Sequence, residues 1–391
     1  MLLSLTDLQA MIETSVVEFL DHEYDFLKRH VSLKSPDGIN PLVWKSFAEM
    51  GWLGLPVSEE LGGIDGGALE SGLLMRAFGQ RLVLEPFHNN VLLATRLLAE
   101  CARSDQQASW LPDLIEGTQR LAFAHDEPDN LDPWAARKTR AIPQAQGFCL
   151  TGGKTLVMGA SGANGVLLSA SVEVPGGEHQ ALFLLPIDTP GLRLNLYPTL
   201  DGGHAADLLL NEIQVGRDSL LGNSTDSAVK LHEVIASGIV DLCWEAGGTM
   251  QAALQQTIGF TQDRVQFGKS ISSFQVVQHR LAEMEVCCAE ALAVCQLAAL
   301  RIQRDPACAT AMASLAKSKV GRGARYVAQE AVQLHGAMGV SDEMATASYF
   351  RKLLAFTQQS GSTAWHSERY GALMLDSGTW RESQSLPTFN A

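Results

Sequence analysis

Several residues in the C-terminal half of the chain have the right chemistry to bind a phosphate-bearing ligand. Arg264 presents a planar guanidinium, which can pair with two oxygens of a pyrophosphate at once. A surface arginine paired in the neighbourhood of Asp263 would have the same local sequence, so that alternative stays open. Gln275 and Gln333 can each donate and accept hydrogen bonds, which suits pyrophosphate, ribose or adenine edges. Together these residues favour a nucleotide-type ligand.

Two positions near these residues suit close contact with such a ligand. Phe267 offers an aromatic face, although a buried phenylalanine more often belongs to a core. Gly336 allows a backbone to approach a ligand closely, because it has no side chain. The segments around Phe267 and Gly336 must therefore fold so that both residues are exposed to the ligand.

Common catalytic motifs are absent from the sequence. Gly152-Gly153-Lys154-Thr155 looks like the end of a P-loop, but Phe148 stands where the first glycine is required. We therefore interpret these four residues as a strand–turn–strand. The glycines at 62–67 do not fit G-x-G-x-x-G, and no H-E-x-x-H, Cys/His zinc spacing or G-x-S-x-G is present. We expect no metal site and no acyl-serine chemistry.

Composition narrows the class of protein further. The 391 residues include 29 Lys+Arg and 43 Asp+Glu, a net charge of −14, which argues against nucleic-acid binding. The seven cysteines form no C-x-x-C pair, and the segment Met1–Asp7 lacks the features of a signal peptide, so we expect reduced thiols and a cytoplasmic protein. The apolar stretch 281–302 is interrupted by glutamates, so no membrane span is expected.

The hydrophobic period changes twice along the chain and so predicts three regions. Residues 5–117 have a helical period, and short apolar runs from 121 to 222 are typical of strands. Helical periodicity returns in long stretches, roughly 226–262, 275–303, 308–335 and 341–356. We predict an α+β multidomain chain with an N-terminal helical domain (1–120), a middle β-sandwich or barrel (121–225) and a C-terminal four-helix bundle (226–391). A ligand cleft is expected where the β domain meets the bundle.

In their order along the chain, these segments resemble the acyl-CoA dehydrogenase family of flavoproteins over nearly the whole length. The family likeness rests on Trp52–Gly63, Arg264–Ile271 with Phe274–Met284, and Gln333–Gly339. The family has the same three-part architecture. Within it, the chain is most similar to the small-subunit type of pimeloyl-CoA dehydrogenase, on shared phrases at 77–79, 82–86, 242–246 and 335–353.

The resemblance implies FAD as cofactor. In the family, the Arg-x-x-Phe-Gly and Gln-Leu-x-Gly-Gly segments come from neighbouring subunits, so FAD would lie across a dimer interface. Ala337 here replaces the second glycine. The positions implied at this end of FAD are Arg264, Gln266, Phe267, Phe274, Gln275, Gln333, Leu334, Gly336 and Ala337.

At the isoalloxazine end the sequence departs from the family pattern. Asp126-Glu127-Pro128 stands in place of Thr-Glu-Pro, and Leu156-Val157-Met158 in place of Trp-Ile-Thr. The resemblance thus implies Asp126, Leu156 and Met158 as flavin neighbours. Because Met158 has no hydroxyl to reach flavin N5, any such contact would have to come from backbone.

Dehydrogenation of a thioester requires a base for the α-proton while the flavin takes the β-hydride. The family places a glutamate at one of two positions, which here are Gly238 and Ser360. Neither residue can act as that base. Asp241, on nearly the same helix face as Gly238, is a candidate, with a solvated or ion-paired carboxylate as the alternative. Glu245 is expected to pair with an arginine of the bundle.

Some relatives that act on dicarboxylic or steroid side-chain thioesters are α2β2 assemblies in which one subunit type supplies the base. The resemblance therefore suggests a subunit without the base, which acts on acyl-CoA in a homo- or hetero-oligomer and passes electrons to an electron-transferring flavoprotein. A flavin oxidase-like relative is an alternative that Ser360 disfavours, since it too needs an acid there. A scaffold that binds acyl-CoA or FAD without catalysis is the other alternative.

Overall fold

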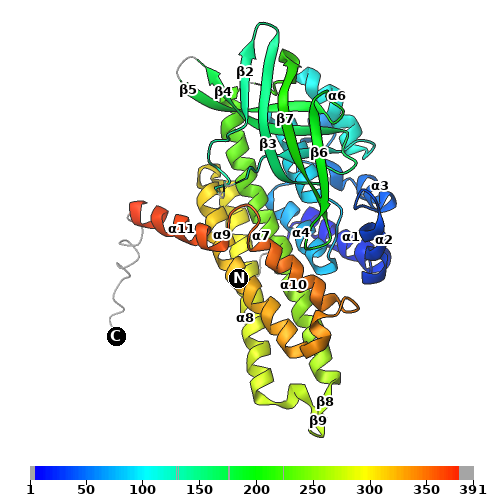
Figure 1. Cartoon of the computed structure of the whole chain (residues 1–391). Helices are drawn as coiled ribbons and strands as arrows, with labels where there is room; N and C mark the ends of the chain where they lie inside the picture. The colour runs from blue at the N-terminus through cyan, green and yellow to red at the C-terminus, as the bar shows by residue number, and fades with distance from the viewer. Residues whose placement is uncertain (1–4, 129, 131, 175–176, 223, 378–391) are drawn as a thin grey trace.

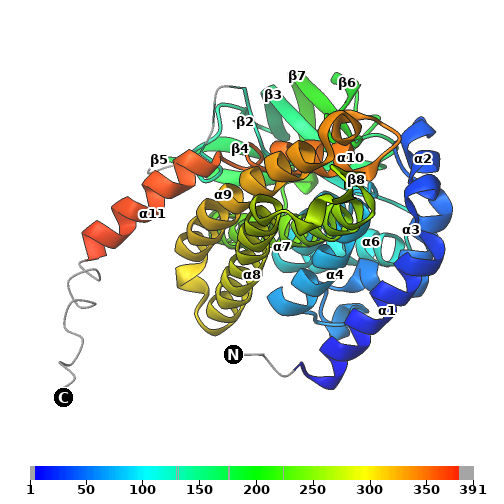
Figure 2. The ribbon, with the colours of Figure 1, turned by 90° about the horizontal axis from the view of Figure 1, so that it is seen from below.

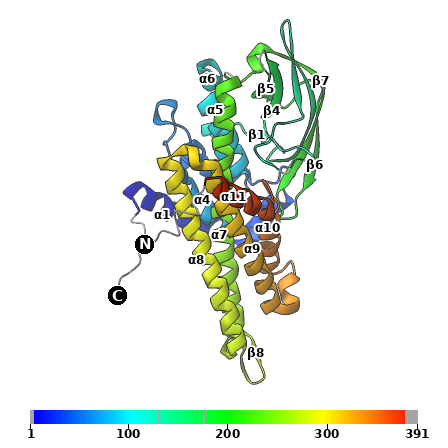
Figure 3. The ribbon, with the colours of Figure 1, turned by 90° about the vertical axis from the view of Figure 1, so that its left-hand side faces the viewer.

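A computed structural model describes residues 5–128, 130, 132–174, 177–222 and 224–377 (Figure 1). Residues 1–4, part of the N-terminal stretch considered above, and residues 378–391 of the predicted bundle domain lie outside the described residues. Helices at both ends of the chain pack together, and a β-sheet from the middle of the chain lies across one end of them (Figures 1 and 3).

The N-terminal helices are short and begin at local capping signals. In α1 the Thr6 hydroxyl accepts from the Gln9 amide at 3.3 Å, and the Gln9 side chain accepts from the Thr6 amide at 3.0 Å. Pro41 opens α3, where its missing N–H costs nothing. The helices are α1 (Asp7–Glu23), α2 (Phe26–Lys34), α3 (Pro41–Glu49), α4 (Ala68–Arg81), the π-helical segment η3 (His88–Thr95), α5 (Arg96–Cys101) and α6 (Ser104–Ile115).

The middle region forms one seven-stranded sheet within the described residues, in the order β1-β4-β2-β3-β7-β6 with β5 paired to β4. The strands are β1 (Leu121–Ala124), β2 (Arg140–Gln144), β3 (Gly147–Met158), β4 (Gly165–Val174), β5 (Gly177–Pro186), β6 (Leu192–Pro198) and β7 (His204–Gly216). The strand–turn–strand interpretation of 152–155 is wrong, because β3 runs through them with two register irregularities against β7. The buried ammonium of Lys154, paired with Glu127 at 2.7 Å, keeps this segment inside the sheet.

The C-terminal region contains the long helices that the periodicity predicts. They are α7 (Ser224–Asp263), α8 (Gln275–Arg304), α9 (Ala309–His335) and α10 (Ala345–Phe356). A small hairpin of β8 (Val265–Gln266) and β9 (Lys269–Ser270) joins α7 to α8 at the end of the molecule away from the large sheet (Figure 3). A further helix that the hydrophobic period does not predict, α11 (Thr363–Ser377), points away from the bundle (Figure 2).

One apolar core joins the N-terminal helices to the bundle, and the sheet has a second core of its own. Helix α4 packs so closely on α7 that a Cβ at Gly79 would overlap the Glu245 carbonyl oxygen, and one at Gly248 would overlap the Arg76 carbonyl oxygen. The Thr249 hydroxyl donates to the Gly79 carbonyl at 3.1 Å across the same contact. The predicted fold class, helical then β then helical bundle, is confirmed.

Candidate functional site

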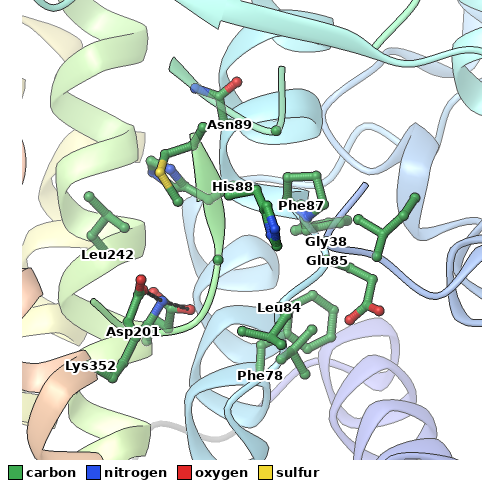
Figure 4. A pocket seen from close by; sticks show the side chains of 18 of the residues that line it. Gly38, Phe78, Leu84, Glu85, Phe87, His88, Asn89, Asp201, Leu242 and Lys352 are labelled. Carbon is green, nitrogen blue, oxygen red and sulfur yellow. Dashed lines mark hydrogen bonds and ion pairs between the residues drawn. The ribbon is translucent and has the colours of Figure 1, made fainter. Parts of the chain in front are cut away.

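Two adjoining cavities lie where the sheet, the N-terminal helices and the bundle meet. We call them the sheet-side and the helix-side cavity; His88, Asn89, Met158 and Gln359 line both. The sheet-side cavity is also lined by Phe123, Asp126, Leu156, Gly238 and Ser360. The helix-side cavity is also lined by Phe78, Glu85, Asp201, Leu242 and Lys352, with Leu242 and Lys352 facing Phe78 and Glu85 across it (Figure 4).

The sheet-side cavity brings together residues that are far apart in the sequence. Asp126, Leu156 and Met158, implied at the isoalloxazine end, line it from the sheet side. Gly238 of α7 and Ser360, the two positions where the resemblance implies a glutamate, line the same cavity, and neither carries a carboxylate.

Hydrogen bonds hold the backbone at Leu156, whose φ of 53° is in the left-handed region. Its amide donates to the Tyr197 hydroxyl at 3.2 Å and to Asp207 Oδ1 at 3.3 Å. Thr155 and Tyr197 also donate to Asp207, and although partial burial acts in the opposite direction, these bonds lower the pKa of that carboxyl. The Leu156 amide is therefore already bonded within the protein.

The Asp126–Pro128 turn is fixed by a buried ion pair. Glu127 accepts from Lys154 at 2.7 Å and from the amide and hydroxyl of Thr139 at 3.0 and 2.6 Å. Burial lowers the pKa of Lys154 to about 8, against the attraction of Glu127. Burial also raises the pKa of Asp126, while Arg137 and Lys154 partly oppose that rise.

The turn at Ser360 is held by two donors from the bundle. Ser360 has φ 52° and Gly361 has φ 91°. Lys317 donates to the Gln359 carbonyl at 2.6 Å, and His366 Nε2 lies 2.9 Å from the Ser360 carbonyl oxygen. These contacts keep the turn against the cavity although its side chain carries no acid.

Asp241, the candidate base, is not among the described residues that line the two cavities. Its carboxylate accepts from the Ser71 hydroxyl of α4 at 2.6 Å and is buried, and burial raises its pKa to about 7. Among the described residues that line the two cavities Asp241 does not occur, whereas Gly238 and Leu242 of the same helix do. The side chain thus contacts α4, and its position does not favour a role as base.

Glu245 lines the helix-side cavity, but the prediction that it pairs with an arginine is wrong. It pairs with Lys352 of α10 at 2.9 Å, and Lys352 also contacts Asp201 at 3.3 Å. Burial would lower the pKa of Lys352, but the two carboxylates outweigh it and raise that pKa. This ion cluster ties α7, α10 and the loop before β7 together at the cavity wall.

The residues implied at the adenosine end lie at the other end of the long helices, in and beside the β8–β9 hairpin. Phe267, at φ 54°, is 92% exposed, so it is not a core residue in the described chain. Its ring meets that of Phe274 edge to face at 6.1 Å. Gln266 and Gln275 flank the two rings in sequence. The exposed aromatic pair offers a surface on which a planar group could stack.

The end of α9 reaches the same region. His335 stacks on Phe260 of α7 at 4.3 Å, and the Arg264 amide donates to the Phe260 carbonyl at 2.9 Å. Nothing lies within 4 Å of a Cβ built on Gly336, so space is open there. The segment Gln333–Ala337, with Leu334, therefore lies near the base of the hairpin.

The residues of the sheet-side cavity and those around the β8–β9 hairpin lie far apart in one protomer, and this distance limits how they could bind one cofactor. Gly238 and Asp263 are twenty-five residues apart on the unbroken helix α7, which corresponds to roughly 38 Å at 1.5 Å per residue. An FAD molecule cannot stretch that far. Within one protomer, the residues of the sheet-side cavity and those around the hairpin therefore cannot both contact a single FAD. They could do so only if they come from different protomers.

Sequence reasoning missed His88, Asn89 and the ion cluster of Asp201, Glu245 and Lys352. The only local signal at His88 was a histidine that begins a largely apolar run. Among the described residues no cluster of three His, Cys, Asp or Glu side chains could hold a metal ion, and none of the helices described is both long and apolar enough to cross a membrane.

Comparison with known proteins identifies the chain as a member of the acyl-CoA dehydrogenase class of oxidoreductases. Residues 6–118 match the model of the acyl-CoA dehydrogenase N-terminal domain, and residues 234–374 match that of the C-terminal domain. The probable acyl-CoA dehydrogenase YngJ of Bacillus subtilis is 28% identical over 349 residues, which cover 87% of this chain and 90% of YngJ.

Solved structures have the same fold. A Tcur3481-Tcur3483 steroid ACAD variant superposes with a TM-score of 0.85 at 25% identity, over 95% of this chain and 99% of that one. The ChsE4-ChsE5 complex from Mycobacterium tuberculosis gives 0.85 at 24% identity, over 98% and 99%. The chain belongs to the acyl-CoA dehydrogenase family, whose members bind FAD.

Proposed function

We propose that this protein is an FAD-dependent acyl-CoA dehydrogenase that introduces an α,β double bond into an acyl-CoA thioester. The observation that carries the proposal is the sheet-side cavity, where Asp126, Leu156 and Met158 adjoin both family base positions. Family membership supports the same chemistry. The proposal requires a cofactor site shared between protomers.

The residues present fit FAD at both ends. Arg264 would pair with the pyrophosphate, the exposed Phe267 would stack near the adenosine, and the open space at Gly336 would admit the ligand. Leu156 and Met158 would pack against the ring system. Bound FAD supplies the acceptor for the β-hydride.

The helix-side cavity would hold the acyl group. Its wall combines Phe78 and Leu242 with the ion cluster around Lys352, whose charges are already paired. Because Lys352 is paired with two carboxylates, the cavity can exclude water from the reacting carbons without leaving an unpaired cation in the wall.

A second form of the function is a subunit of a hetero-oligomer whose partner supplies the base. Gly238 and Ser360 at the cavity wall support it, and the resemblance to a pimeloyl-CoA dehydrogenase small subunit belongs with it. A steroid ACAD and a two-component complex have the same fold. In this form an electron-transferring flavoprotein would still reoxidise the flavin.

Anaerobic addition of acyl-CoA to the purified protein tests the proposal. We expect flavin absorbance from the isolated oligomer and loss of that absorbance after the thioester is added. Bleaching only after co-expression with a paralogous subunit would establish the second form. A protein that stays colourless with added FAD, both alone and after co-expression with the paralogous subunit, would refute both.

A further inference from the structure

The space at the Gly238 base position is not empty. A Cβ built on Gly238 would lie 2.5 Å from Leu93 Cδ2 and 3.2 Å from His88 Nε2. Both side chains come from the π-helical segment η3 of the N-terminal region. A side chain at 238 would therefore have to displace Leu93 and crowd His88, because a leucine and an imidazole from another element already fill the space beside it.

The contacts of His88 fix its tautomer. Nε2 lies 2.8 Å from the Gly238 carbonyl oxygen. A carbonyl oxygen can only accept, so Nε2 carries the proton and Nδ1 holds a free lone pair. No hydrogen bond to Nδ1 occurs within the described part of the chain. Such an oriented imidazole with one free nitrogen has the arrangement of a general base.

The surroundings keep this imidazole neutral. Burial, with smaller contributions from Lys352 and Lys317, lowers the pKa of His88 to about 4, although the hydrogen bond to Gly238 acts in the opposite direction. The ring is therefore unprotonated at neutral pH and has a free lone pair, although the same surroundings make it a weaker base than an exposed histidine. The other titratable groups around the two cavities are Asp37, Glu85, His125, Asp126, Asp201, His204 and Glu245.

We propose that His88 is the catalytic base of this chain, acting in place of the absent glutamate. The inference rests on the proposed dehydrogenase function. His88 lines both cavities, at the junction where the α-carbon of an acyl group in one would face a flavin in the other. His88 Nδ1 would accept the proton as the Cα–H bond breaks, and the electron pair of that bond would become the Cα=Cβ bond. Bound FAD would supply the two-electron acceptor for the β-hydride.

Exchange of the substrate α-protons with deuterium tests the proton step directly. The purified, flavin-containing oligomer is incubated with butyryl-CoA in D2O, and NMR follows loss of the α-proton signal. We expect exchange with the unchanged protein, and at least about a 100-fold slower exchange with His88→Gln, the usual scale of a lost general base. Flavin content should be the same for both. His179→Asn, a half-buried histidine of β5, controls for general effects and should exchange at the unchanged rate.

A second measurement does not depend on flavin or turnover. The 15N shifts of histidine-labelled protein, assigned through His88→Gln, should show Nε2 protonated and Nδ1 unprotonated at pH 7. A protonated Nδ1 would overturn the inference, as would His88→Gln protein that exchanges as fast as its parent.

One further outcome of the exchange experiment distinguishes a failure of the His88 proposal from a failure of the proposed dehydrogenase function. If the flavin-containing protein exchanges no α-protons until a paralogous subunit is added, the base belongs to the partner and His88 is not the base. The proposed flavin chemistry would survive that result. A protein without flavin would instead remove the proposed function itself.

Discussion

At the scale of single residues, some buried ionisable groups in the described part of the chain have an oppositely charged partner and others, such as Asp241, have none in the ion pairs found there. Lys154 has Glu127, and Lys352 has two carboxylates. Asp241 has only a neutral hydroxyl from Ser71 within hydrogen-bond distance among the described residues. Burial without a cation makes the ionised form unfavourable, which is why the pKa of Asp241 rises to about 7.

The first prediction concerns stability against pH. The pKa of Asp241 is higher in the folded state than the ordinary 3.8, so the folded protein binds the extra proton. The resulting stability is fully present below about pH 4 and is lost as the pH rises through about 7, by on the order of 4 kcal/mol. Urea unfolding of Asp241→Asn should show a much smaller loss of stability between pH 5 and pH 8.

A surface carboxylate serves as control for that prediction. Asp188→Asn, at an exposed position, should retain the parent's pH dependence. If Asp241→Asn and the parent lose stability in parallel over this interval, the carboxyl does not titrate there and our description of its surroundings is wrong.

At the scale of elements, the contact of α4 with α7 holds the two helical regions in one core. Gly79 and Gly248 allow the backbones to touch, since each would place a Cβ on a carbonyl oxygen of the other helix. The same helix α7 lines both cavities through Gly238 and Leu242. The position of the site therefore depends on how closely α4 approaches.

Two glycine substitutions on α7 should have opposite effects. Gly248→Ala must push the Arg76 carbonyl away, so we expect a loss of about 1–3 kcal/mol in the free energy of unfolding. Gly259→Ala meets nothing within 4 Å and should raise stability by about 0.5–1 kcal/mol, because alanine is the better helix former. Urea titrations of the two variants measure both, and equal effects would contradict the close contact.

At the scale of the whole molecule, the two groups of residues that would hold FAD lie far apart along α7. The hairpin with Arg264 and Phe267 follows the C-terminal end of α7 (Figures 1 and 3). The sheet-side cavity is lined by Gly238, twenty-five residues before that helix ends at Asp263. In a symmetric oligomer, each protomer would thus contribute its hairpin residues to one FAD site and its cavity residues to another.

Mixing two defective variants tests this arrangement. Arg264→Ala and Met158→Arg should each lose flavin while their far-UV circular dichroism stays that of the parent. Refolding an equimolar mixture should restore roughly a quarter of the flavin content, because half of the dimers are mixed and each has one intact site. No recovery in mixed oligomers, confirmed by native mass, would show that one protomer holds the whole cofactor.

Much of the fold could be predicted from the sequence because its signals are local. A period of 3.6 residues identifies α7 to α10, and short runs such as Leu121–Ala124 mark strands that form where they were expected. Lys154 shows the limit of this reasoning. Its glycine neighbours indicate a turn, but a partner from another segment, Glu127, keeps the strand continuous.

The sequence by itself determined the order of the helical and β regions and the absence of glutamate at 238 and 360, since these depend on residue types and their spacing alone. Only the tertiary structure decided that Asp241 contacts α4, that Glu245 pairs with Lys352, and that His88 fills the space beside Gly238. Each of these depends on two segments far apart in the chain that meet in space, and no local period encodes which side chains will meet there.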